Sequence, residues 1–269
     1  MGTRNLTIVQ VDGMYKVAQY GQWDGYPSGQ GSTALKFLHS LDKASLVAFR
    51  DKVRALKEIS PEEYKAKWVE CGADPDEDMV SMDVSDKFKK RYPHLQRDMG
   101  AEILSYIMMK SDPGLKLQKE IEFAADSLFC EYAYVIDLDK GVFEIYMGHN
   151  CIPLKEGDRF FFLEKLSQKD HRTTQYHPVR LMKTYKLSRL PKEKTFVKVC
   201  DRECEAIMVL DDIKASGSVE IPACSSSVQA LKEIFAVPKN LPLLMGISKD
   251  LDAKVARKLK SKHLETKKL

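Results

Sequence analysis

Alternating apolar and polar positions near the N-terminal end of the chain predict a β-hairpin. Residues 6–11 and 15–19 both alternate in character, which is the pattern of strands with one buried face. Asp12-Gly13 lies between them and is a dipeptide typical of two-residue hairpin turns. We therefore expect two antiparallel strands that lead the chain into a glycine-rich segment.

A second alternating stretch, residues 130–148, predicts another hairpin. Asp139-Lys140-Gly141 supplies its turn, and residues 179–187 have the composition of an additional edge strand. Pairing of the two hairpins would give a four-stranded antiparallel sheet. Together with the helices expected between the hairpins, this pattern indicates an α+β protein with a helix-flanked antiparallel sheet.

Helical periodicity dominates the residues between the two hairpins. Apolar side chains recur every three or four positions, which predicts three helices after the glycine-rich segment, the third ending at Gly72. A fourth helix is expected from about Arg97 to Met109, because Asp112-Pro113-Gly114 follows as a break. The expected N-caps are Ser32 or Thr33, Asp42, and Ser60 with Pro61 and Glu63 behind it.

The pattern changes after Pro191, so we expect a main domain over residues 1–190. Residues 191–269 would form a C-terminal α/β extension or a small second domain. Its expected elements are strands at 196–200 and 206–210, a capped helix at 225–236, and a basic terminal helix from Leu251 onward.

The charge distribution argues against a nucleic-acid-binding surface. The net charge is +4, but the last 21 residues contain eight basic and three acidic residues, so the rest of the chain is electrically balanced. Nucleic-acid-binding proteins more often spread basic residues over a folded face, interleaved with aromatic side chains. We interpret the basic terminus as a solvated helix end.

Cysteine usage and hydropathy indicate a cytoplasmic protein without a membrane anchor. The six cysteines are scattered, no secretory signal precedes them, and no apolar stretch approaches the roughly 18 residues that a membrane span requires. Gly2 begins a myristoylation-like start, but Leu6 occupies the position that should be Ser or Thr. The cysteine spacings do not match a zinc site, and we expect neither metal nor cofactor.

The strongest candidate for a binding site is the segment from Gln19 to Ser32 together with Gly2-Thr3-Arg4. Four of the 14 glycines lie between residues 21 and 31, among aromatic and amide side chains. Glycine allows close backbone approach to a ligand, and the aromatic rings would stack on it. The expected ligand-binding residues are Arg4, Gln19, Tyr20, Gln22, Trp23, Tyr26, Gly29, Gln30 and Gly31.

In this interpretation the backbone amides of residues 29–31 would bind an anionic or carbonyl group, and Asp24 would hold Arg4 or a ligand donor. The segment is neither a Walker A loop, which needs Gly-Lys-Ser/Thr, nor a dinucleotide-binding fingerprint inside a parallel βαβ unit. An alternative stays open: the glycines only turn the chain, and the aromatic rings only cover the edge of the sheet.

Three segments resemble a group of uncharacterised proteins from bacteria, their phages and fungi. They are GTRNL at residues 2–6, YGQWDGYPSGQG at 20–31 and EYAYVIDLDKGVFEIY at 131–146. The resemblance covers roughly residues 1 to 150 and implies no established activity. It does admit a non-catalytic role, such as a phage-encoded modulator that binds a protein partner through the exposed aromatic loop.

The N-terminal end is also similar, more weakly, to N-terminal-nucleophile hydrolases. That similarity implies an amide-type hydrolase in which Thr3 is the nucleophile, Asp24 lies nearby, and Gln22 or Gln30 donates to an oxyanion. The mechanism requires a free α-amine on Thr3, and therefore cleavage between Gly2 and Thr3. Ligand binding, hydrolysis and partner binding are thus the three functions to compare.

Overall fold

The computed structural model describes residues 2–77, 79–110, 112, 114–169 and 174–216, and confirms an α+β protein. The strands are β1 (Asn5–Val11), β2 (Met14–Gly21), β3 (Lys57–Glu58), β4 (Lys116–Leu117), β5 (Tyr132–Asp137), β6 (Val142–Met147), β7 (Gln168–Lys169), β8 (Gln175–Tyr176) and β9 (Arg180–Lys186). The helices are α1 (Ser32–Ser40), α2 (Lys43–Ala55), α3 (Pro61–Glu70), α4 (Met82–Arg91), α5 (Glu102–Met109) and α6 (Glu193–Ser216). Single 3₁₀ or π turns are η1 (Pro27–Gly31), η2 (Pro93–Leu95), η3 (Ile121–Ala125), η4 (Phe161–Leu166) and η5 (Leu187–Arg189).

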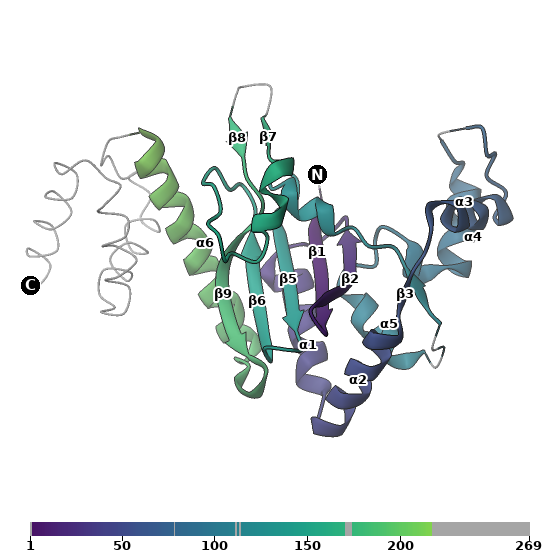
Figure 1. The fold of residues 1–269 in the computed structure, drawn as a ribbon, viewed down its shortest axis with the longest axis horizontal. Helices are drawn as coiled ribbons and strands as arrows, with labels where there is room; N and C mark the ends of the chain where they lie inside the picture. Colours follow the sequence, from purple (N-terminus) through teal and green to yellow (C-terminus); the bar gives the residue numbers. More distant parts are fainter. Residues whose placement is uncertain (1, 78, 111, 113, 170–173, 217–269) are drawn as a thin grey trace, which may run out of the picture. The chain divides into compact units, whose positions relative to one another are not determined.

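The main sheet has five strands in the order β2-β1-β5-β6-β9 (Figure 1). Both predicted hairpins are present, as the antiparallel pairs β1–β2 and β5–β6. The predicted edge strand is also present, because β9 pairs antiparallel with β6.

The prediction of a purely antiparallel sheet is wrong at one pair of strands. β1 and β5 run parallel, with Asn5 opposite Tyr132 and Gln10 opposite Asp137. The chain between them passes through five helices, and this long crossover brings β5 back to the same end of the sheet from which β1 started. The hairpins were predicted from local turns, which carry no information about how they pair with each other.

One face of the sheet is covered by short turns rather than by long helices. Leu6, Ile8, Ala133 and Val135 project from this face and pack with Phe160 and the turns η3 and η4. All four side chains are inaccessible to solvent. We call it the η face.

The opposite face carries the helices, and α2 contacts both β1 and β2. Tyr134 and Phe143 stack there with ring centroids 6.4 Å apart, and Phe143 stacks in turn on Phe196 of α6 at 6.0 Å. Burial of such rings is the largest apolar contribution a single side chain can make. The sheet is therefore buried on both faces, which explains the nearly continuous apolar stretches in β1 and β5.

Helices α3 and α4 form a small hydrophobic cluster of their own. Ser60 caps α3 with a reciprocal capping box to Glu63, as predicted, and Gly72 follows with a φ of +104°. The rings of Trp68 and Phe88 stack in parallel, 3.7 Å between centroids and 4° between planes. This stack fixes α3 against α4. Because Phe88 is inaccessible to solvent, the aromatic surface next to the glycine-rich loop comes from the partly exposed Trp68.

Two expected elements differ from those observed. The predicted helix from Arg97 begins only at Glu102, because Gly100 has a φ of +48°, outside the right-handed helical region. The strands predicted at 196–200 and 206–210 are parts of the single helix α6. Phe196 and Cys200 are both fully buried and four residues apart, which is helical spacing, and the valines between them misled the prediction.

The chain divides into two units between residues 197 and 198. The domain boundary expected after residue 190 stays a prediction. The helix predicted at 225–236 and the basic terminal helix lie outside the described residues. Within the described part of the chain, no helix combines the length and apolar character needed to cross a membrane.

A pH effect on stability is expected from His94 in η2. Its ring stacks on Tyr106, and burial, assisted by Lys67 and Lys110, lowers the pKa of His94 to about 4. The folded protein therefore binds the proton less tightly than the unfolded chain, so stability is intact above about pH 6.5 and is lost as the pH falls through 4. The loss should be about 1–2 kcal/mol, since the ring is partly exposed.

Urea unfolding between pH 7 and pH 4 measures this effect. A His94→Phe variant keeps a stacking ring but cannot bind a proton, so its stability should fall less over this range than that of the wild type. Identical pH profiles for the two proteins would contradict the assignment.

Candidate functional site

The glycines of the loop are required by close packing within the protein. A Cβ on Gly29 would lie 2.2 Å from the carbonyl oxygen of Asp24, and one on Gly25 would lie 2.6 Å from that of Thr3. Gly21 and Gly31 are equally tight, against Asn5 and Tyr134. None of the four has a positive φ. Ordinary packing thus explains these glycines, so their presence by itself is no evidence for a ligand.

The backbone amides of residues 29–31 are already engaged, which corrects the expected anion cradle. Gly29 N and Gly31 N donate to the carbonyl of Tyr26 at 2.9 and 3.3 Å, and Gln30 N donates to that of Asp24 at 2.8 Å. The π turn η1 continues directly into α1, whose first residue, Ser32, donates its amide to Gly29 O. Because η1 supplies these carbonyls, neither Ser32 nor Thr33 acts as the predicted N-cap.

The loop's aromatic rings differ in exposure. Trp23 and Tyr26 each expose 52% of their surface, whereas Tyr20 is partly buried against Phe123, with ring centroids 5.0 Å apart. Tyr26 lies 6.1 Å from the ring of Tyr132. Trp23 and Tyr26 are therefore available for contacts outside the chain, as a binding loop requires.

The three N-terminal residues support the loop. A Cβ on Gly2 would lie 2.3 Å from the indole ring of Trp23, so Gly2 packs directly against that ring. Thr3 is buried, and its carbonyl accepts from Gly25 N at 2.9 Å. The guanidinium of Arg4 lies 4.3 Å over the ring of Phe129.

Asp24 does not hold Arg4. Its side chain is exposed, its φ is +54°, and among the described residues no ion pair joins it to Arg4. The hydrolase hypothesis for Thr3 and Asp24 stays a prediction.

Three glutamines tie the loop to residues 96–101. Gln19 donates to Gln96 O at 3.2 Å, and Gln30 accepts from Ala101 N at 2.7 Å. Gln22 N donates to Arg97 O at 3.1 Å, while the guanidinium of Arg97 donates back to Gln22 Oε1. The loop is therefore held from both sides before any ligand arrives.

A cleft of about 450 Å³ opens where this loop faces α3 and α4. Trp23 and Gln22 line it on the loop side, and Trp68 and Phe88 line it on the helix side. The remaining lining residues are Tyr64, Ser85, Lys89, Gln96, Arg97 and Asp98. Aromatic walls with a few polar groups between them are typical of small-molecule sites.

The electrostatics of the cleft favour a negative group near Arg97. The side chains of Lys89 and Asp98 neutralise each other in an ion pair of 3.4 Å, whereas Arg97 pairs with the neutral Gln22. Gln22 Oε1 also accepts from the hydroxyl of Tyr20 at 2.6 Å, so its amide nitrogen remains a donor. Burial raises the pKa of Tyr20, although Arg97 and Arg4 act against it.

Of the nine expected ligand-binding residues, only Gln22 and Trp23 line the cleft. Tyr20 does not line the cleft but donates its hydroxyl to Gln22, which does. The side chains of Gln19 and Gln30 instead form hydrogen bonds that connect the loop to residues 96–101. Sequence reasoning missed Arg97, Trp68 and Phe88, which lie 45 or more residues from Trp23 along the chain. No local sequence signal connects these residues to the loop.

Comparison of the chain with protein-family models, with curated proteins and with solved structures gave no match. The resemblance to a bacterial, phage and fungal group therefore stays a prediction. In the part of the chain that the structure describes, no group of three or more His, Cys, Asp or Glu residues is placed to hold a metal ion.

Proposed function

We propose that the chain is a ligand-binding protein whose loop 19–32 forms one wall of the cleft facing α3 and α4. The observation that carries the proposal is the pair of facing walls around a cleft of about 450 Å³: half-exposed Trp23 on the loop and partly exposed Trp68 on the helices, with the fully buried Phe88 ring stacked behind Trp68. A flat ring is the shape that such walls accept.

Arg97 supports a negative group on the ligand. Its guanidinium is exposed, lines the cleft and has no carboxylate partner among the described residues. A phosphate or carboxylate would accept a charge-assisted hydrogen bond there, and the amide nitrogen of Gln22 would add a second donor. The proposed ligand class is therefore a planar ring that bears an anionic group.

Preorganisation is the main contribution of the glycine-rich loop. Its amides, glutamines and close backbone contacts hold Trp23 in place, and Gly2 supports one side of the indole. A ligand that binds such a loop spends little free energy on ordering it.

Intrinsic fluorescence offers a direct test, because both tryptophans of the chain, Trp23 and Trp68, line the same cleft. Nucleoside monophosphates carry a ring and an anion, nucleosides only the ring, and ribose 5-phosphate only the anion. We expect saturable changes in emission with at least one monophosphate. Its nucleoside and ribose 5-phosphate should each bind about tenfold or more weakly.

Variants locate the response. Trp23→Phe and Trp68→Phe each leave one tryptophan, and both single-tryptophan proteins should report the same dissociation constant. Arg97→Met should weaken binding of the monophosphate about tenfold and leave the affinity for the nucleoside unchanged. Arg189→Met removes an exposed arginine that does not line the cleft and serves as the control.

Two outcomes would refute the proposal. One is the absence of saturable binding by every monophosphate tested. The other is binding that Arg97→Met and Arg189→Met weaken equally.

Trp23→Ala, in contrast, should change the free energy of unfolding by only about 1 kcal/mol, since half of the ring surface is already in solvent.

A further inference from the structure

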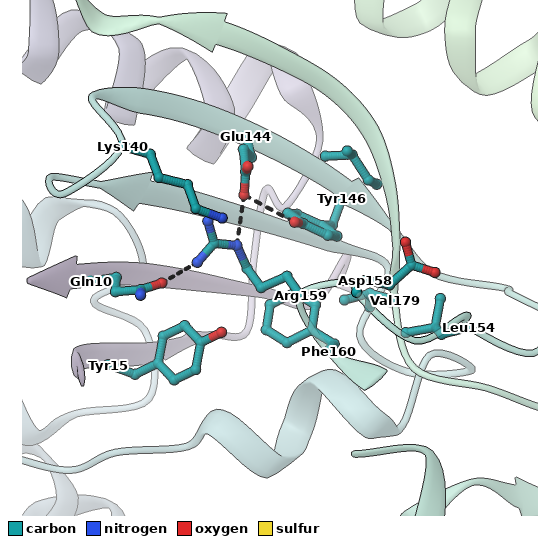
Figure 2. A pocket seen from close by; sticks show the side chains of 12 residues that line it. Gln10, Tyr15, Lys140, Glu144, Tyr146, Leu154, Asp158, Arg159, Phe160 and Val179 are labelled. Atoms are coloured by element: carbon teal, nitrogen blue, oxygen red, sulfur yellow. Dashed lines mark hydrogen bonds and ion pairs between the residues drawn. The ribbon is translucent and has the colours of Figure 1, made fainter. Parts of the chain in front are cut away.

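A second polar site lies on the η face, remote in sequence from the loop. Arg159 enters this face, and only 7% of its side chain is exposed. Its Nη2 donates to Asp137 at 2.6 Å. Its Nε donates to Glu144 at 2.7 Å and its Nη1 donates to Gln10, as Figure 2 shows. Three adjacent strands, β1, β5 and β6, thus each provide one acceptor for a single guanidinium.

A hollow of about 260 Å³ borders this network. Besides Arg159 and its partners Gln10 and Glu144, it is lined by the polar side chains of Tyr15, Lys140, Tyr146 and Asp158. The apolar part of its wall comes from Leu154, Phe160, Val179 and Leu181, with Gly157 between. Buried charges are costly, and a charged network placed beside a hollow rather than inside a sealed core is a common arrangement of binding sites.

Two charged groups at the hollow keep hydrogen-bonding capacity that the protein does not use. Glu144 Oε2 accepts from both Arg159 and the Tyr146 hydroxyl, but its Oε1 has no hydrogen-bond partner among the described residues. The ammonium of Lys140 makes no ion pair with any described residue. Figure 2 shows Lys140 extending from the β5–β6 turn toward the side of the hollow where Arg159 lies.

Arg159 is neutralised by Asp137 and Glu144, and the carboxylate of Asp158 also lines the hollow. The groups that remain for a ligand are Glu144 Oε1 and the ammonium of Lys140, which no described carboxylate neutralises. A ligand that complements both must carry an ammonium and a carboxylate a short distance apart. A sugar fits less well, because the Tyr15 ring already stacks with the rings of Phe160 and Phe162, at 6.3 and 6.0 Å between centroids.

We propose that this hollow binds a free α-amino acid with an apolar side chain. The ligand's ammonium donates to Glu144 Oε1, and its carboxylate accepts from Lys140. The side chain of the ligand lies against Leu154 and Val179. A volume of about 260 Å³ is below the range of roughly 300–1,000 Å³ typical of drug-sized ligands, which suits one amino acid better than a peptide.

Calorimetric titration with L-leucine, L-methionine and L-valine tests the proposal on the full chain. We expect saturable binding of at least one of them. For leucine, leucinamide removes the carboxylate and 4-methylpentanoate removes the ammonium, with corresponding analogues for the other two. Each analogue should bind about tenfold or more weakly than its parent amino acid. No saturable binding of any of the three up to about 10 mM would overturn the proposal.

Variants assign the two charges. Lys140→Met changes an exposed residue. It should weaken binding of the amino acid about tenfold and leave the affinity for the amide analogue unchanged. Lys43→Met, at an exposed lysine of α2 that does not line the hollow, should have no effect. Equal affinities of Lys140→Met and wild type for the amino acid would overturn the assignment. Failure at this site leaves the cleft at Trp23 untouched, because the two sites share no lining residue.

Discussion

Replacing Arg159 with methionine is expected to destabilise the protein by about 3–5 kcal/mol at neutral pH. The substitution keeps most of the side-chain volume but removes the cation between Asp137 and Glu144. Asp137 is inaccessible to solvent and Glu144 exposes only 8% of its surface, so both carboxylates would be left buried without their counter-ion. An uncompensated buried charge costs far more than the ion pair itself contributes.

The loss of stability caused by Arg159→Met should depend on pH. Burial raises the pKa of Asp137, but the Arg159 hydrogen bond and the backbone amides of Lys140 and Asp139 outweigh it and hold this pKa below its ordinary value. Asp137 therefore stabilises the wild type above its unfolded pKa, and this contribution is lost as the pH falls through the lower folded pKa. In the variant, Asp137 is buried without Arg159, which favours its protonated form. Acidification should therefore narrow the difference in free energy of unfolding between the wild type and Arg159→Met.

Urea unfolding at pH 7 and at about pH 4 measures both effects. Arg54→Met is the control, since Arg54 pairs with Asp12 and Asp51 at the surface and its loss should cost less than about 1 kcal/mol. The explanation is wrong if Arg159→Met costs no more than the control, or if its cost is the same at both pH values.

Gly29→Ala is expected to be the most damaging single change in the loop, at about 3 kcal/mol. The new Cβ would lie 2.2 Å from a backbone carbonyl, that of Asp24, which cannot move away as a flexible side chain could. The Gln30 amide donates to the same carbonyl, so displacement of Asp24 would also break that hydrogen bond.

Ser28→Ala, one residue earlier and exposed, is the matched control and should change stability by less than about 0.5 kcal/mol. Equilibrium unfolding gives the two free energies, and tryptophan emission of the folded variants reports whether Trp23 has moved. Equal stability of the two variants would show that the loop accommodates a Cβ at this position.

Local chemistry was enough to predict much of the fold. Asp12-Gly13 identified the first hairpin, and the capping box at Ser60 identified the start of α3, because each signal is complete within a few residues. The parallel pairing of β1 with β5 could not be predicted in this way. It depends on the path of more than one hundred intervening residues, and no local signal records that path.

The candidate site was predicted only in part for the same reason. Trp23 stood out because an aromatic ring among glycines suggests an exposed loop, and it is half-exposed. Its partners Arg97 and Trp68 belong to elements whose own patterns are those of an ordinary connection and an ordinary helix. The sequence left open whether the glycines serve a ligand or the chain itself, because an internal contact and a ligand contact require the same absent side chain.

The pairing of residue 5 with residue 132 also has a consequence for synthesis on the ribosome. At a translation rate of about 5–20 residues per second, the edge of β1 that pairs with β5 stays unpaired for on the order of 10 s, until β5 has been translated. During that interval the first hairpin exposes unpaired backbone groups and the apolar side chains of β1. Nascent chains should therefore depend on chaperones most while the helices between these two strands are being made.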